Sequence, residues 1–238
     1  ISNNIANSNT NAFKRSRSEF VDFYSKALSS SPKSKGGLGT MLQGTQKIMK
    51  QGSPILTGSA LDLTISGKGF FILSPREDAD PRFTRDGSFS LDASGNLITT
   101  EGFNVAGYTK NADGTINYGV ALPINIPLTL ESSEGKNLIL SQINVNNRGF
   151  IETTYGLNTI VERGQIALAK FNNETELKST GSNTFQATQK SGEQILGVAM
   201  NSNYGKILAG ALESSNTNIS MEMVNLIKTQ QAFNGNAR

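Results

Sequence analysis

The chain has 238 residues, carries a net charge of +3 and contains neither cysteine nor histidine. These two absences exclude cysteine–histidine zinc sites, Ser-His-Asp triads and disulfides, so we expect no metal, no cofactor and no enzymatic activity. No block of Lys or Arg indicates a nucleic-acid surface. No apolar run approaches the roughly 20 residues that span a bilayer, so membrane insertion is not expected either.

The first 28 residues mix apolar side chains with Asn and Ser. The opening stretch fits the end of a helix. The turn-forming residues at 7–11 should break that helix, because their side chains compete for backbone hydrogen bonds. Residues 18–28 fit either a short helix or an extended segment, and 29–39 read as a loop rich in Ser, Lys and Gly. Because the chain begins at Ile1, we expect it to be truncated at this end.

Residues 218–238 carry the clearest helix pattern. Asn218 or Ser220 can cap this helix, and Glu222 complements the positive charge of its first turn. Apolar residues recur at intervals of three and four, which predicts one apolar stripe that some other surface must bury. The stripe consists of Ile219, Met223, Leu226, Ile227, Gln230 and Phe233 or Asn234. It reaches the last residues, so we expect truncation here too, and we expect the two chain ends to lie close together.

The middle of the chain, roughly 35–212, carries strand patterns. Apolar and polar residues alternate over 61–65 and over 165–171, and a short apolar strand follows the first of these at 70–73. Residues 61–71 and 83–98 should belong to one β-domain. We expect the core of this domain to include Leu63, Ile65, Phe71, Phe89 and Leu97.

Turn residues divide these strands. Asp86-Gly87 and the Ser-Gly-Asn run at 94–96 are typical hairpin signals, so we expect two hairpins here. The segment 122–127 contains two prolines, which cannot donate to a sheet ladder, so it should be an edge or a crossover. Gly67-Lys68-Gly69 lacks the spacing of a phosphate-binding loop and predicts a tight connection between strands.

Four segments together resemble one protein family. Residues 2–14 resemble the amino-terminal signature of flagellar rod, hook and hook-associated proteins, except that Ala12 replaces the usual Gly. Residues 61–71 resemble the family's L-D-L-A-I-x-G-x-G-F-F motif, and 83–97 resemble the hairpin that follows it. Residues 210–237 resemble the family's carboxyl-terminal helix. The segments occur in the family's order, so the chain is similar to a flagellar axial protein.

The resemblance implies a mainly β fold with α-helical ends, in which β-rich outer domains are inserted between the two helical segments of an inner core domain. Residues 1–34 and 205–238 would be the α-helical or extended inner-core segments. Residues 35–110 and 145–204 would form the β-rich domain, and 111–144 a short insert or crossover.

The resemblance also implies self-assembly into a helical tube, located in the flagellum as extracellular hook or periplasmic basal-body rod. Partners would be further copies of the chain, adjacent axial proteins (rod, hook cap and hook–filament junction) and the type III export apparatus. We expect the assembly contacts at Asn3, Asn4, Ala6, Asn7, Thr10, Phe13, Lys14, Met223, Leu226, Ile227, Gln230 and Phe233.

The subtype follows from shorter similarities. Hook-like stretches occur at 34–39, 105–108, 165–169, 187–192 and 195–197. Against them, only about forty residues separate Tyr108 from Asn147, a spacing similar to that of the distal rod protein. The sequence favours the hook, a flexible joint that transmits torque, with the distal rod as the alternative. More distant alternatives are another extracellular β-rich surface protein, or a glycosidase with paired carboxylates, for which no pair can be nominated.

Overall fold

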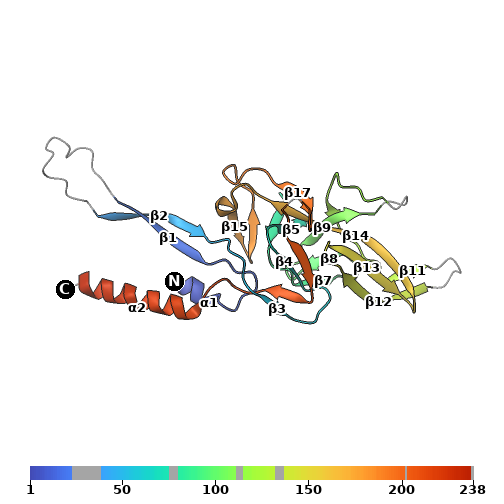
Figure 1. Cartoon of the computed structure of the whole chain (residues 1–238), viewed down its shortest axis with the longest axis horizontal. Helices are drawn as coiled ribbons and strands as arrows, with labels where there is room; N and C mark the ends of the chain where they lie inside the picture. The colour runs from blue at the N-terminus through green and yellow to red at the C-terminus, as the bar shows by residue number, and fades with distance from the viewer. Residues whose placement is uncertain (23–38, 75–79, 111–114, 132–136, 202, 237–238) are drawn as a thin grey trace.

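The computed structural model describes residues 1–22, 39–74, 80–110, 115–131, 137–201 and 203–236. The molecule is elongated, with two helices and a two-stranded hairpin at one end and the larger group of strands at the other (Figure 1). The described part of the chain is mainly β, which confirms the predicted class in its coarse form. The expected loop at 29–39 lies outside the described residues except for Gly39.

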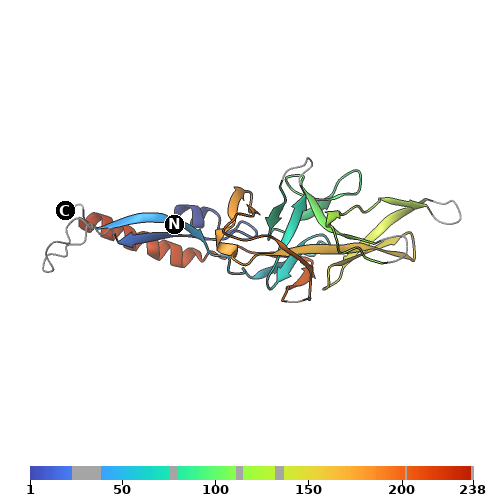
Figure 2. The same ribbon diagram turned by 90° about the horizontal axis from the view of Figure 1, so that it is seen from above.

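We call the helix-bearing end the arm. It consists of α1 (Ser2–Ala6), β1 (Ser16–Asp22), β2 (Thr40–Lys47) and α2 (Ile219–Asn236). Figures 1 and 2 both place α1 beside α2, so the two ends of the chain meet as predicted. β1 pairs antiparallel with β2, which settles the choice between helix and extended segment over β1 in favour of a strand.

Local chemistry accounts for the bounds of the two helices. α1 ends within the predicted turn, where the Asn7 side chain donates to the Asn3 carbonyl at 2.9 Å. α2 begins after Asn218, whose Oδ1 accepts the Met221 N–H at 3.1 Å, the predicted cap. Ala12 has a φ of +54°, a left-handed conformation that favours glycine. That backbone requirement explains the Gly of the family signature at this position.

We call the strands from β4 to β18 the body. Its first strands are β4 (Leu63–Ser66), β5 (Phe70–Ser74), β6 (Arg82–Thr84), β7 (Phe89–Leu91), β8 (Leu97–Thr99), β9 (Asn104–Thr109) and β10 (Leu122–Pro123). The later ones are β11 (Thr129–Glu131), β12 (Asn137–Val145), β13 (Phe150–Tyr155), β14 (Thr159–Lys170), β15 (Lys178–Gly181), β16 (Thr184–Gln186), β17 (Ile195–Val198) and β18 (Lys206–Ala209). A 3-10 turn, η2 (Glu174–Glu176), precedes β15.

Most of the body is one antiparallel sheet in the order β11-β12-β13-β14-β9-β5-β6-β16-β15, with β7, β8, β10 and β17 attached to it. Strands from both parts of the predicted β-rich domain therefore enter the same sheet. β18 pairs with β4, and β19 (Ala211–Glu213) pairs with β3 (Pro54–Leu56) between body and arm. As expected, the proline segment is not a central strand, because β10 has only two residues and pairs with β9, although the following Ile124 and Ile126 are buried in the core.

The described residues of the body form two hydrophobic clusters. All five predicted residues, Leu63, Ile65, Phe71, Phe89 and Leu97, lie in the larger cluster. Phe70 and Ile72 of β5 point the other way, into a second cluster with Phe83, Phe171 and Phe185. β14 divides its side chains in the same manner. Alternation predicted which residues are buried, but these strands are covered on both faces.

The hairpin predicted at Asp86-Gly87 is wrong. β6 pairs with β5 and β16, whereas β7 pairs with β8 across the correctly predicted turn at 94–96. Gly87 is needed for a different reason: a Cβ there would lie 1.7 Å from the Leu63 carbonyl oxygen, and the Gly87 carbonyl accepts the Leu63 N–H. The glycine allows the chain to cross close against β4.

Candidate assembly surface and the arm–body junction

Polar side chains of α2 border a groove between this helix and the rest of the arm. Glu222, Asn225, Lys228 and Thr229 line the groove that separates α2 from α1 and β1. Glu222 is only 4% exposed, and its carboxylate lies 3.9 Å from the Arg15 guanidinium. Glu222 is the buried residue of this helix, whereas Asn225, Lys228 and Thr229 stay exposed along the groove.

The predicted apolar stripe of α2 is largely exposed. Met223 is 50% exposed, Ile227 54% and Phe233 71%, while Gln230 is exposed and Leu226 half-buried. A surface helix normally turns its apolar stripe inward and its polar residues to water. Here most of the stripe is exposed, and Leu226 is the stripe residue that the subunit partly covers.

The amino-terminal signature serves two purposes. Asn4 is buried and exchanges two hydrogen bonds with Ser16, one from its Nδ2 to the carbonyl at 3.0 Å and one from the Ser16 N–H to its Oδ1 at 2.9 Å. Phe13 is buried under the Lys47 ammonium, 4.8 Å from the ring centroid. Asn4, Phe13 and Lys14 thus contact other parts of the same subunit.

The other signature residues are more accessible. Asn3 and Ala6 are exposed, and Asn7 and Thr10 are half-buried. The Thr10 hydroxyl donates to Asn7 Oδ1 at 3.2 Å and stabilises the turn after α1. A role in contacts between copies stays a prediction for these four residues, as it does for the stripe.

Arm and body are joined at a buried charge cluster, which we call the junction cluster. It consists of Lys14, Arg85 and Glu213, of which none is more than 3% exposed. Lys14 Nζ donates to Glu213 Oε1 and, at 3.0 Å, to the Lys50 carbonyl. Arg85 Nη1 lies 3.5 Å from Glu213 Oε2.

Backbone groups complete the junction cluster. The Gly52 N–H donates to Glu213 Oε1 at 2.9 Å, and Arg85 Nη2 donates to the Gly67 carbonyl at 2.8 Å. Burial lowers the pKa of Lys14, and the nearby Arg85 charge lowers it further, whereas Glu213 and Glu174 raise it. Sequence reasoning missed Arg85 and Glu213: each lies in a conspicuous motif, but no local spacing reveals that they meet.

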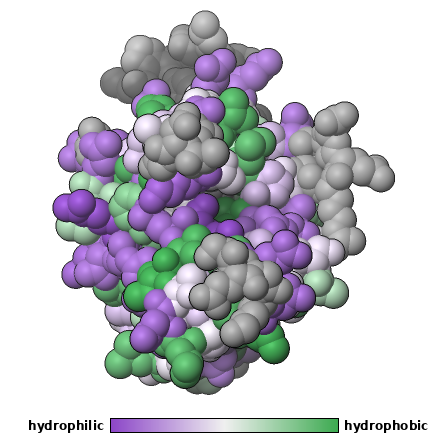
Figure 3. Space-filling model, turned by 90° about the vertical axis from the view of Figure 1, so that its right-hand side faces the viewer, coloured by the Kyte–Doolittle hydropathy of each residue, from purple (hydrophilic) through white to green (hydrophobic). Residues whose placement is uncertain are grey.

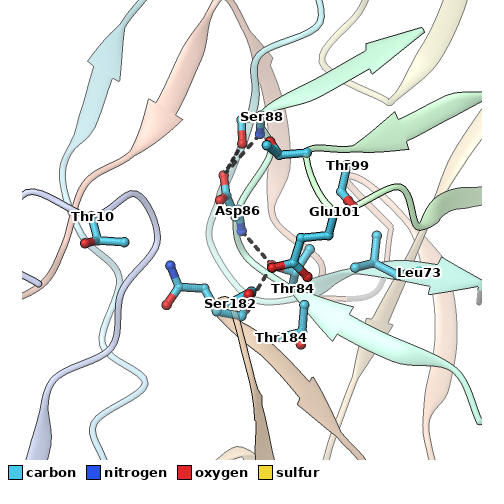
Figure 4. Close-up of a pocket in the computed structure, with 11 residues that line it drawn as sticks. Thr10, Leu73, Thr84, Asp86, Ser88, Thr99, Glu101, Ser182 and Thr184 are labelled. Atoms are coloured by element: carbon cyan, nitrogen blue, oxygen red, sulfur yellow. Dashed lines mark hydrogen bonds between the residues drawn. The ribbon is translucent and has the colours of Figure 1, made fainter. Parts of the chain in front are cut away.

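The body also has a small cleft, shown in Figure 4, of about 260 Å³. It is lined mainly by hydroxyl side chains together with Asp86 and Glu101. Asp86 Oδ1 already accepts two hydrogen bonds from Ser88, from the N–H at 3.1 Å and from the hydroxyl at 2.8 Å. The cleft is below the usual size of ligand sites. Among the described residues, no group of three or more acidic side chains could hold a metal ion.

Comparison with known proteins identifies the family. Residues 64–166 match the flagellar hook protein FlgE/F/G D1 domain, and 208–238 match the flagellar basal body rod FlgEFG protein C-terminal domain. The flagellar basal-body rod protein FlgG of Buchnera aphidicola from Schizaphis graminum is 33% identical over 250 residues, covering 100% of this chain and 86% of the relative. The chain belongs to the flagellar rod and hook protein family. Members of this family are structural components of the flagellar basal body and hook.

Rod and hook members of the family differ in how much of this chain they match. FlgG of Borreliella burgdorferi is 32% identical over 251 residues and again covers 100% of this chain, with 85% of the relative. The hook protein FlgE of Helicobacter mustelae is 46% identical, but over 121 residues, which are 46% of this chain and 27% of the relative. The rod relatives therefore match over the whole chain, and the hook relative matches over about half of it.

No helix among the described residues is long and apolar enough to cross a membrane.

Apolar side chains are also exposed at the end of the body opposite the arm, interspersed with polar ones (Figure 3). They include Ile139 at 70%, Leu157 at 96% and Ile160 at 69%.

Proposed function

We propose that the chain is a structural subunit of the distal rod, the drive shaft of the flagellar basal body, and that it has no catalytic role. The observation that carries this proposal is the similarity to FlgG along the entire chain, with 86% of the relative covered. The hook protein, which the sequence favoured, is the weaker candidate. Its support is the higher identity of one hook relative over about half of the chain.

The exposed apolar side chains of α2 support assembly with further copies. Much of the apolar surface of Met223, Ile227 and Phe233 is not covered by the rest of the subunit. Burial of such surface is the main driving force of association. A contact between two different surfaces of identical subunits repeats from one copy to the next. It produces an open helical filament when the rotation does not close. The stripe is one half of such a contact.

The proposed partners are other copies of this chain along the axis and the neighbouring axial proteins at each end of the segment. The family resemblance further suggests delivery by the flagellar type III export apparatus. The absence of cysteine suits a chain that travels unfolded, since no disulfide has to form or be broken on the way.

Deletion of the gene in the source bacterium separates rod from hook. Basal bodies purified from the deletion strain and viewed by electron microscopy should lack the distal rod and everything beyond it. Reintroduction of the gene should restore the rod. If basal bodies from the deletion strain have a complete rod and lack only the hook, the rod assignment is refuted and the chain is a hook subunit. A complete rod and hook would refute both.

A further inference from the structure

Two short segments, residues 48–53 and 213–218, connect the arm to the body, and a third segment, residues 12–15 between α1 and β1, lies against them. Single chains of this length rotate freely unless something ties them together. The segments are tied at Asn216, whose Nδ2 donates to the Ile48 and Lys50 carbonyls at 2.7 and 2.8 Å, and whose Oδ1 accepts the Arg15 N–H at 2.8 Å. Asn216 therefore holds the three segments to one another on the arm side.

Glu213 ties the same segments to the body. Its Oε1 accepts from Lys14 of the first segment and from the Gly52 N–H of the second, and it is itself part of the third. Its Oε2 faces Arg85, which lies in the body and is anchored there to the Ile65 and Gly67 carbonyls at 3.3 and 2.8 Å. One buried carboxylate thus connects all three segments with a fixed point on the body.

We propose that Glu213 is a positioning residue, which sets the direction of the arm relative to the body through the junction cluster. The cluster contains two cations and one carboxylate, so loss of the carboxylate leaves Lys14 and Arg85 buried without their partner. Buried charges without a partner are unstable. The cations would draw in water, and the three segments would separate.

A fixed arm direction matters for the proposed assembly. A stripe that pointed in many directions could not repeat one contact from copy to copy. The inference itself rests on the junction geometry and not on the proposed function, because it concerns the single subunit. It can therefore fail while the rod assignment holds, and the reverse is equally possible.

The direction of the arm can be measured by electron spin resonance. The chain contains no cysteine, so Gln231→Cys on α2 and Ser90→Cys on β7, both at exposed positions, introduce two unique sites for spin labels. Pulsed dipolar spectroscopy then gives the distance distribution between arm and body. The measurement is made on the full chain, at a concentration where sedimentation shows a monomer.

Glu213→Gln should broaden the distance distribution and shift its mean, while the body keeps its folded circular dichroism spectrum. The matched control is Glu19→Gln, the same chemical change in an exposed ion pair with Arg17, and it should leave the distribution narrow. An unchanged narrow distribution in Glu213→Gln would overturn the proposal.

A second variant covers the case in which Glu213→Gln does not fold. Lys14→Met combined with Glu213→Gln removes one cation together with the carboxylate, and Arg85 keeps its two carbonyl partners. This double variant should have a folded body and a broad arm distribution. A narrow distribution would overturn the proposal. An unfolded body would also overturn it, because the cluster would then stabilise the body and not position the arm.

Discussion

Ile227→Asp tests whether the stripe of α2 is an assembly surface. In the single chain the Ile227 side chain is 54% exposed, so an Asp there should change the free energy of unfolding by no more than about 0.5 kcal/mol. If a neighbouring copy covers the stripe, the loss is larger. About half of the burial value of an Ile, roughly 1 kcal/mol, disappears, and a buried carboxylate without a partner costs at least about 2 kcal/mol more. The sum of about 3 kcal/mol weakens each contact about a hundredfold.

The assay is the electron microscopy of basal bodies from cells in which the variant is the sole copy, together with motility. Ile227→Asp should give no distal rod and no swimming, although the purified variant unfolds at the wild-type urea concentration. Thr229→Asp is the control, because it makes the same charge change at an exposed position on the groove side of α2. We prefer Ile227 to Leu226, which is half-buried in the chain itself. Full-length rods and normal swimming in Ile227→Asp cells would refute the assembly role of the stripe.

Three further measurements address the fold. Phe71→Ala should destabilise the body by about 3–5 kcal/mol in urea unfolding, because Phe71 is fully buried and its ring centroid lies 5.1 Å from that of Phe89. The control Leu157→Ala, at a 96% exposed position, should have almost no effect. Equal effects of the two variants would show that the core lies elsewhere. Asn4→Ala should cost about 1–3 kcal/mol, since it leaves two backbone groups without partners, and the exposed Asn3→Ala should cost less than about 0.5 kcal/mol. Burial lowers the pKa of Lys14 in the folded protein below 10.5. The unfolded chain therefore binds the ammonium proton of Lys14 more tightly than the folded chain does. The free energy of unfolding should then rise as the pH increases from the folded-state pKa toward 10.5. Lys14→Met should lack this rise in a series of urea titrations, and an identical pH dependence in both proteins would contradict it.

Side-chain alternation predicted the core residues because a strand has only two faces. Leu63 and Ile65 lie two positions apart in one strand and point to the same side, and both are fully buried. The same rule could not reveal that β5 buries Phe70 and Ile72 on its other face, since an apolar run carries no sign of which cluster each side chain enters.

Turn chemistry was less reliable because the same residue types serve several backbone needs. The Asp-Gly pair at 86–87 is a frequent hairpin signal. In this protein Gly87 is required by its close approach to the Leu63 carbonyl, and Asp86 accepts hydrogen bonds from Ser88 within the connection. A sequence shows that a glycine is present, and only the fold shows which neighbour needs the space.

The junction cluster lay beyond sequence reasoning for a different reason. Lys14 and Glu213 are 199 positions apart, and Arg85 lies in a third motif. In a local window each residue resembles an ordinary surface charge. Their meeting depends on β19, which brings Glu213 beside the segment after β2, and on Gly52, where a Cβ would lie 1.9 Å from the Ser214 carbonyl oxygen. Long-range pairing of this kind becomes visible only when the three segments at the junction are in place.

The sequence predicted the apolar stripe of α2, and the structure shows how much of that stripe is exposed. The spacing of Met223, Ile227 and Phe233 predicted a stripe but not the surface that covers it. The usual rule would turn that stripe inward. In the fold, Glu222 is buried beside the Arg15 guanidinium and Leu226 is half-buried, while Met223, Ile227 and Phe233 stay exposed. Whether a second chain buries these three side chains is the prediction that Ile227→Asp tests.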